Sequence, residues 1–178
     1  MNELDATARL RCPPPERPFH VVLVEPEIPP NTGNVARLCA ATGSHLHLVG
    51  KLGFRVDEHA VRRAGLDYWH LVAVEQHADL PAAEGRVLER SPGATLWFLS
   101  GHANQSYLEA DIKPGDAFVF GKESVGLEPS LLEARSATAL GIPTLGGVRS
   151  HNLANAVAIV LYEALRKTGQ LATPTLVP

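Results

Sequence analysis

Three polar stretches of the sequence contain side chains that could take part in chemistry. The first is Arg149-Ser150-His151-Asn152, which opens a long apolar segment. Helix N-termini present unpaired N–H groups and a partial positive charge, so they favour capping side chains and anions. Ser150 and Asn152 are therefore candidates for a binding site, although either could serve only as a helix cap.

The second stretch is rich in proline and ends at Arg37. We expect its three prolines to hold residues 25–34 in a rigid loop, and a helix to begin at about Asn34. Arg37 would then lie in the first turn, where a positive charge opposes the helix dipole, and a locally unfavourable choice of this kind indicates a function. A solvated arginine, or one paired with Glu25 or Glu27, is the alternative.

The third stretch is Gly121-Lys122-Glu123-Ser124-Val125-Gly126, directly after a short apolar segment. Its glycines would let a ligand approach the backbone, and Glu123 could bind that ligand or orient Arg37 or Asn31. The stretch lacks the features of a nucleotide-phosphate loop and of a dinucleotide-binding loop. Ser150 has no nucleophile elbow around it, and the scattered histidines lack zinc-ligand spacing, so neither a serine hydrolase nor a metal site is predicted.

Strand-like and helix-like patterns alternate along the chain. Strands are expected at 19–24, 45–49, 71–74, 95–99, 117–120 and 139–143, and helices at 34–41, 57–64, 80–90, 129–135 and from the Arg149 segment to about 167. This alternation predicts an α/β fold with a mostly parallel sheet and helices on both faces. Ligands bind beyond the carboxyl ends of such strands, so the loops after Val24, Leu99, Phe120 and Ile142 are the candidate site.

The last helix is apolar on two sides. One stripe runs from Leu153 to Leu165 at helical spacing, and Ala158, Ile159 and Tyr162 lie opposite it. A helix of this kind needs burial on both sides. We therefore expect one side to face the sheet and the Tyr162 side to face a second copy of the chain in a homodimer.

Composition favours a single globular domain. The chain has 178 residues, of which 45% are hydrophobic, and we expect a domain at 19–169 between a flexible arm at 1–18 and a tail at 170–178. The net charge of −3 means that nucleic-acid binding would need a local basic patch. Two distant cysteines, Cys12 and Cys39, and the lack of a signal-like or membrane-spanning segment predict a cytoplasmic protein.

Three motifs occur in a fixed order. They are Asn31-Thr32-Gly33-Asn34-x-x-Arg37, Phe120-Gly121-x-Glu123-x-x-Gly126-Leu127, and Ile142-Pro143 followed by Arg149-Ser150-x-Asn152-Leu153. Together they resemble the motifs of SPOUT-superfamily RNA 2′-O-methyltransferases, over roughly residues 21–167. The 25–34 segment and Arg62-Arg63-Ala64-Gly65-Leu66-Asp67-Tyr68 are similar to the single-domain branch that methylates the tRNA wobble nucleotide, cytidine or 5-carboxymethylaminomethyluridine.

This resemblance implies a fold and a cofactor. It implies a C-terminal trefoil knot, an obligate homodimer, and S-adenosylmethionine bound in the knot without a metal ion, with S-adenosylhomocysteine as the product. The positions that match the cofactor site are Leu99, Gly121, Gly126, Ile142, Ser150 and Leu153.

The resemblance also implies catalytic roles. Arg37 would act on the ribose 2′-hydroxyl, supported by Asn31, Glu123, Ser150 and Asn152, or it would position a phosphate while water takes the proton. The candidates for contact with tRNA phosphates are Arg55, Arg62, Arg63 and Arg149. Two other functions are considered: a SPOUT methyltransferase for another tRNA or ribosomal RNA site, and a non-catalytic dimer that binds the cofactor or RNA.

Overall fold

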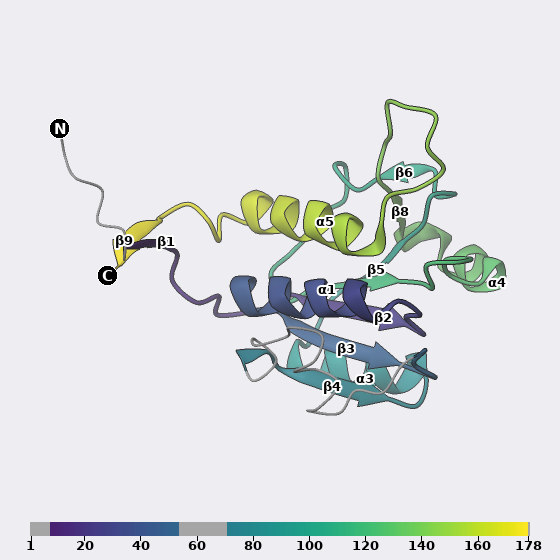
Figure 1. Cartoon of the computed structure of the whole chain (residues 1–178), viewed down its shortest axis with the longest axis horizontal. Helices are drawn as coiled ribbons and strands as arrows, with labels where there is room; N and C mark the ends of the chain where they lie inside the picture. The colour runs from purple at the N-terminus through teal and green to yellow at the C-terminus, as the bar shows by residue number, and fades with distance from the viewer. Residues whose placement is uncertain (1–7, 54–70, 178) are drawn as a thin grey trace.

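The computed structural model describes residues 8–53 and 71–177, and it is built around a parallel sheet (Figure 1). The sheet has seven strands in the order β4-β3-β2-β7-β5-β8-β6, and its paired strands run parallel. The strands are β2 (His20–Val24), β3 (His45–Val49), β4 (Val74–His77), β5 (Leu96–Leu99), β6 (Gln105–Ser106), β7 (Ala117–Phe120) and β8 (Ala139–Gly141).

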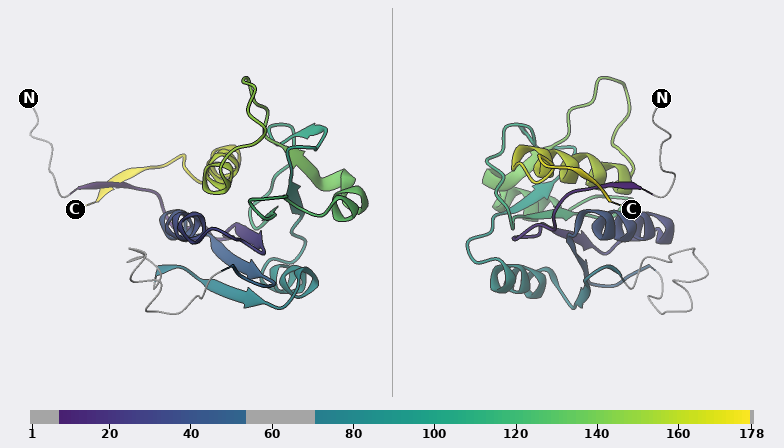
Figure 2. Two further views of the ribbon diagram at one scale, coloured as in Figure 1. Left: turned by 45° about the vertical axis from the view of Figure 1, so that its right-hand side comes forward. Right: turned by 90° about the vertical axis from the view of Figure 1, so that its left-hand side faces the viewer.

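Helices cover both faces of this sheet (Figure 2). They are α1 (Pro29–Thr42) and α5 (Leu153–Lys167) on one face, and α3 (Leu80–Arg90) and α4 (Pro129–Ala134) on the other, with a short 3-10 turn, η2 (Ser136–Thr138). Side chains of a strand alternate between faces, so Val21 and Leu23 pack in the core under α1 and α5, whereas Val22 packs in the core under α3. The α/β class, the parallel sheet and the two helical layers are therefore confirmed.

Helix α1 begins earlier than the sequence analysis expected. It starts at Pro29 rather than at Asn34, and Pro29 and Pro30 occupy its first two positions. The N–H groups of the first turn have no partner within the helix, so proline costs nothing there and its fixed φ suits the turn. Arg37 is consequently the ninth residue of the helix, and the argument that it opposes the dipole from the first turn is wrong.

Other bounds also shift. Strand β4 runs from Val74 to His77, because pairing with β3 starts at Val74 opposite Leu46, and Leu71 is exposed. Strand β8 ends at Gly141, two residues before Pro143, which has no N–H group to donate. The short strand β6 was not predicted. The helix expected at 57–64 lies outside the described residues.

The first and last strands of the described residues pair with each other. Strand β1 (Arg9–Arg11) pairs antiparallel with β9 (Thr175–Val177), and Figure 1 shows this ribbon at the far left of the molecule. The sequence predicts a loose arm and a loose tail, whereas in the structure these six residues form a small sheet. The proposed domain bounds at 19 and 169 stay a prediction.

Histidines that look scattered in the sequence form a chain across neighbouring strands. Nδ1 of His20 lies 3.0 Å from Nε2 of His47, and Nδ1 of His47 lies 2.9 Å from Nε2 of His77. Nε2 of His20 lies 3.0 Å from the Ser91 hydroxyl. Burial lowers the pKa of His20 to about 4 and that of His47 to about 3, so both rings are neutral at pH 7. The rings of His20, His47 and His77 are thus linked by hydrogen bonds between their nitrogens.

Residues 8–53 and 71–177 lack both a metal-binding cluster and a membrane-spanning helix. No cluster of three or more His, Cys, Asp or Glu side chains there could hold a metal ion. No helix in those ranges has the length and the apolar character needed to cross a bilayer.

Candidate active site

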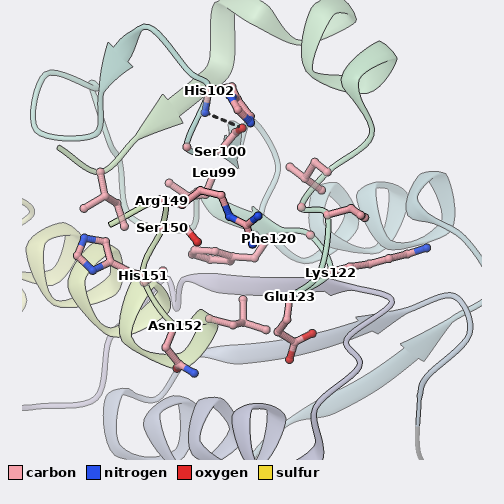
Figure 3. A pocket seen from close by; sticks show the side chains of 18 of the residues that line it. Leu99, Ser100, His102, Phe120, Lys122, Glu123, Arg149, Ser150, His151 and Asn152 are labelled. Carbon is pink, nitrogen blue, oxygen red and sulfur yellow. Dashed lines mark hydrogen bonds between the residues drawn. The ribbon is translucent and has the colours of Figure 1, made fainter. Parts of the chain in front are cut away.

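A pocket of about 550 Å³ lies beyond the carboxyl ends of β5, β7 and β8 (Figure 3). Its wall is made by the loops that follow these three strands, together with Ile28 and the first turns of α5. The strands bring the loops together because β5 pairs with β7 on one side and with β8 on the other. The site is thus assembled from segments that lie far apart in the chain, from Ile28 to Ala156.

The floor of the pocket is apolar and its rim is polar. Leu99, Phe120, Leu140 and Leu153 line it and are almost fully buried. Its polar lining residues include Ser100, His102, Lys122, Glu123, Ser124, Arg149, Ser150, His151 and Asn152. A pocket of this kind suits a small molecule with a flat apolar part and several polar groups.

Gly121 lies where two parts of one loop almost touch. A Cβ atom on Gly121 would be 2.1 Å from the carbonyl carbon of Gly126 and 2.3 Å from the nitrogen of Leu127. The loop closes through the Gly126 N–H, which donates to the Lys122 carbonyl at 2.8 Å, and Gly126 has a φ of +78°. Both glycines are therefore required by the backbone of the pocket wall.

Asn31 links α1 to the two loops of the site. Its Nδ2 donates to Oε1 of Glu123 at 2.9 Å, and its Oδ1 accepts from Nδ2 of Asn152 at 3.0 Å. Asn152 is also the N-cap of α5, since its Oδ1 accepts from the N–H groups of Ala154 and Asn155. In Figure 3 the side chains of Glu123 and Asn152 both point toward α1. Asn152 is therefore a helix cap and, at the same time, a residue that lines the pocket.

Carboxylates join the loop after β2 to the loop after β7. Glu123 accepts from the backbone N–H groups of Glu27 at 2.8 Å and Ile28 at 3.2 Å. Glu27 accepts in return from the N–H and the hydroxyl of Ser124, each at 3.0 Å. Lys122 forms an ion pair with Glu25 at 2.5 Å, and this hydrogen bond lowers the pKa of the Glu25 carboxyl.

The structure brings together most of the site residues expected from the sequence. Every expected cofactor position lines the pocket: Leu99, Gly121, Gly126, Ile142, Ser150 and Leu153. Glu123, Asn152 and Arg149 also line it, and Asn31 is bonded to two of these residues. Whether these residues bind a cofactor, a phosphate or a reacting group stays a prediction.

Two expected residues that the structure describes, Asn31 and Arg37, do not line the pocket, and three others have no described position. Arg37 is exposed on α1 and is not among the lining residues. Arg55, Arg62 and Arg63 lie outside the described residues. Of the four arginines expected to contact phosphates, the structure therefore gives a position only for Arg149.

Sequence reasoning missed two groups of pocket residues. It did not single out Ser100 and His102, whose bond closes a turn after β5: the His102 N–H donates to the Ser100 hydroxyl at 3.1 Å (Figure 3). It considered Glu27 only as a partner of Arg37 and did not connect it with Ser124. The sequence does show an acidic loop and a glycine loop, each directly after a buried strand. Predicting that these two loops contact each other also requires the order of the strands in the sheet.

Known proteins resemble this chain along most of its length. The SpoU rRNA Methylase family model matches residues 18–162. A tRNA (cytidine(34)-2′-O)-methyltransferase of Acidovorax sp. (strain JS42) is 48% identical over 159 residues, which cover 88% of this chain and 96% of the relative. A solved structure that gives insights into the 2-OH methylation of C/U34 on tRNA is 43% identical, with a TM-score of 0.77, and covers 85% of this chain and 96% of its own.

A more distant solved structure is similar in fold. It is the SpoU methyltransferase AviRb of Streptomyces viridochromogenes in complex with AdoMet, which has a TM-score of 0.72 at 24% identity and covers 86% of this chain and 62% of its own. The motifs, the parallel sheet and these likenesses agree with one another. The chain therefore belongs to the SpoU rRNA Methylase family of SPOUT methyltransferases, the family that its three sequence motifs predicted.

Proposed function

We propose that this protein transfers a methyl group from S-adenosylmethionine to the ribose 2′-oxygen of the wobble nucleotide of tRNA, cytidine or 5-carboxymethylaminomethyluridine. The observation that carries the proposal is the pocket, in which all six positions that match the family's cofactor site converge. Identity of 48% to a tRNA (cytidine(34)-2′-O)-methyltransferase supports this substrate over another RNA site. We place the reaction in the cytoplasm, in agreement with free Cys12 and Cys39.

The pocket suits S-adenosylmethionine in size and in chemistry. Leu99, Phe120 and Leu140 offer apolar contact to an adenine ring, and the Gly121 backbone lies open to close approach. The ligand supplies an activated methyl group, and its demethylated product is S-adenosylhomocysteine. A metal ion has no role in this scheme.

The protein's own contribution is alignment and proton removal. In this scheme the ribose 2′-oxygen would form a bond to the methyl carbon as the carbon–sulfur bond breaks, and the hydroxyl proton would pass to Arg37 or to water. Fixed pocket loops lower the barrier by holding both reactants in line. Asn31, Glu123 and Asn152 hold these loops through their bonds to one another, and Ser150 and Arg149 line the pocket where substrate would enter.

Arg37 is proposed to act on the 2′-hydroxyl. Because Arg37 is exposed on α1 and outside the pocket wall, this role requires the substrate ribose to reach the exposed side of that helix. Arginine is a weak base in water, so a nearby phosphate would have to assist it. Arg37→Lys keeps the charge but loses the guanidinium, and we expect methyl transfer to fall at unchanged tRNA affinity. Near-normal transfer would restrict Arg37 to binding phosphate.

We also propose a homodimer and a C-terminal trefoil knot. Ile159 and Ala158 of α5 are only partly covered, and Tyr162 is 48% exposed, so an apolar face of the helix is available to a second copy. Because the chain has a net charge of −3, a tRNA site would need basic residues from both subunits, which a dimer would supply. The knot is supported by the family fold.

Three measurements test the function. Calorimetry should detect S-adenosylmethionine binding, and purified protein should methylate wobble-cytidine tRNA but not the same tRNA with 2′-deoxycytidine at that position. Ribose methylation at the wobble nucleotide should be lost in a strain that lacks the protein. Binding of S-adenosylmethionine without methylation of any RNA would favour the non-catalytic dimer instead, and methylation elsewhere would favour another RNA site.

A further inference from the structure

We propose that Glu27 is a positioning residue for the methyl donor, and that it acts through Ser124 on the glycine loop of the pocket wall. Glu27 itself does not line the pocket, whereas Ser124 does. The inference rests on the proposed function, because it takes S-adenosylmethionine as the ligand of that wall.

Two adjacent loops each bind the other through a carboxylate side chain. Strands β2 and β7 are parallel neighbours, with Leu23 opposite Phe120, so the loops that follow them leave the sheet side by side. Glu123 of the second loop accepts from the backbone of the first, at Glu27 and Ile28. Glu27 of the first loop accepts from the second, at the N–H and hydroxyl of Ser124. Each loop is held by the side chain of the other.

The two carboxylates hold different parts of the site. The Glu123 carboxylate holds the start of α1, because it also binds Asn31. The Glu27 carboxylate holds the tip of the glycine loop, where Ser124 is exposed and Val125 is 71% exposed. A tip with so little packing is ordered mainly by its hydrogen bonds, and bonds to a charged carboxylate are stronger than neutral ones.

Loss of Glu27 should therefore loosen the wall without disturbing α1. The base of the loop keeps its own closure between Gly126 and Lys122, and the Glu123 bonds to α1 remain. The donor would then have to order the tip as it binds, and affinity falls when binding must order its own site. Once the donor is bound, the reacting groups are in place, so the rate at saturation should change little.

The test compares Glu27→Gln, Ser124→Ala and Ser124→Thr with the wild type. We expect Glu27→Gln to weaken S-adenosylmethionine binding about tenfold in calorimetry, equivalent to about 1.4 kcal/mol. The KM for the donor should rise by a similar factor, with kcat and the KM for tRNA almost unchanged. Ser124→Ala should have a smaller effect, and Ser124→Thr, which keeps the hydroxyl, should bind as the wild type does.

A double variant shows whether Glu27 and Ser124 act on donor binding through one shared contact or independently. Glu27→Gln combined with Ser124→Ala should be no worse than Glu27→Gln alone if both act through one contact. Glu133→Gln, on the exposed side of α4, is the matched control and should bind the donor normally. All variants should melt close to the wild type.

The inference would be overturned if donor affinity were unchanged in Glu27→Gln, or if the losses in the double variant were fully additive. A wild-type protein that does not bind S-adenosylmethionine at all would instead overturn the proposed function. A fall in kcat at saturating donor, with the donor KM unchanged, would also contradict the positioning role.

Discussion

At the scale of single residues, Asn31 shows how a neutral amide can connect two segments. Asn152 accepts from backbone N–H groups with Oδ1, so its Nδ2 must be the donor to Asn31. Asn31 must then accept with Oδ1 and donate with Nδ2, which matches the carboxylate of Glu123 at the other end. The chain of bonds has one direction, and only a side chain that both donates and accepts can fill its middle position.

Asn31→Asp tests this direction, because it changes one atom and no volume. The new carboxylate cannot donate to Glu123, and two like charges would face each other in a site where Asn31 is only 6% exposed. We expect a loss of about 1–3 kcal/mol, measured by urea unfolding. Asn155→Asp, exposed in the first turn of α5, should not destabilise the protein, since a negative charge is favourable there.

Gly121→Ala should damage the pocket wall directly. Its Cβ would overlap the backbone of Gly126 and Leu127, which cannot rotate away as a side chain could. We expect about 1–3 kcal/mol of destabilisation, or a displaced loop, together with loss of S-adenosylmethionine binding. The matched variant Gly85→Ala, where a Cβ meets nothing within 4 Å on helix α3, should be neutral or slightly stabilising. Normal donor binding by Gly121→Ala would contradict this account of the wall.

At the scale of elements, local patterns in the sequence predicted most of the strands and helices, but not every boundary and not the order of the strands in the sheet. The strands at β2, β3 and β7 were predicted within a residue because short buried runs are unambiguous. The start of α1 was wrong because Pro29 and Pro30 were taken to break a helix that they begin. The Glu27–Ser124 contact could not be predicted, since it depends on β7 lying next to β2, and strand order is a long-range property.

The histidine chain across β2, β3 and β4 makes stability depend on pH. Folding lowers the pKa of His20 and His47 from 6.5, so the unfolded chain takes up protons first as the pH falls. The stability is therefore complete above about pH 6.5 and declines below it, by at most about 1.4 kcal/mol per pH unit for each histidine.

Urea unfolding between pH 7.5 and pH 5 measures this decline, above the range in which most carboxyl groups titrate. His102→Gln, at an exposed histidine that is not part of this chain of rings, is the matched control. A flat profile in the wild type would mean that these rings are not neutral and bonded to one another in the folded protein.

At the scale of the whole molecule, one face of α5 is still uncovered. The Leu153–Leu165 stripe is in the core, whereas Tyr162 is 48% exposed beside Ile159. A stable dimer buries roughly 1,200 Å² or more, so this face would be the centre of a larger interface. Ile159→Asp should give a monomer by light scattering, because it places a charge at that centre. Leu88→Asp, on an exposed leucine of α3, should leave the assembly unchanged, and a wild-type monomer would refute the proposed dimer.

The pairing of β1 with β9 sets Arg9 opposite Val177, so a short linker could ligate the chain into a ring. In a chain with the proposed trefoil topology, ligation would seal the crossing, and no denaturant could then untie it. With that topology, the open chain would have to thread one end through a loop each time that it refolds from a fully untied state, whereas the ring would begin already threaded. We expect the ring to regain donor binding faster after prolonged denaturation; equal rates for both forms would count against the trefoil.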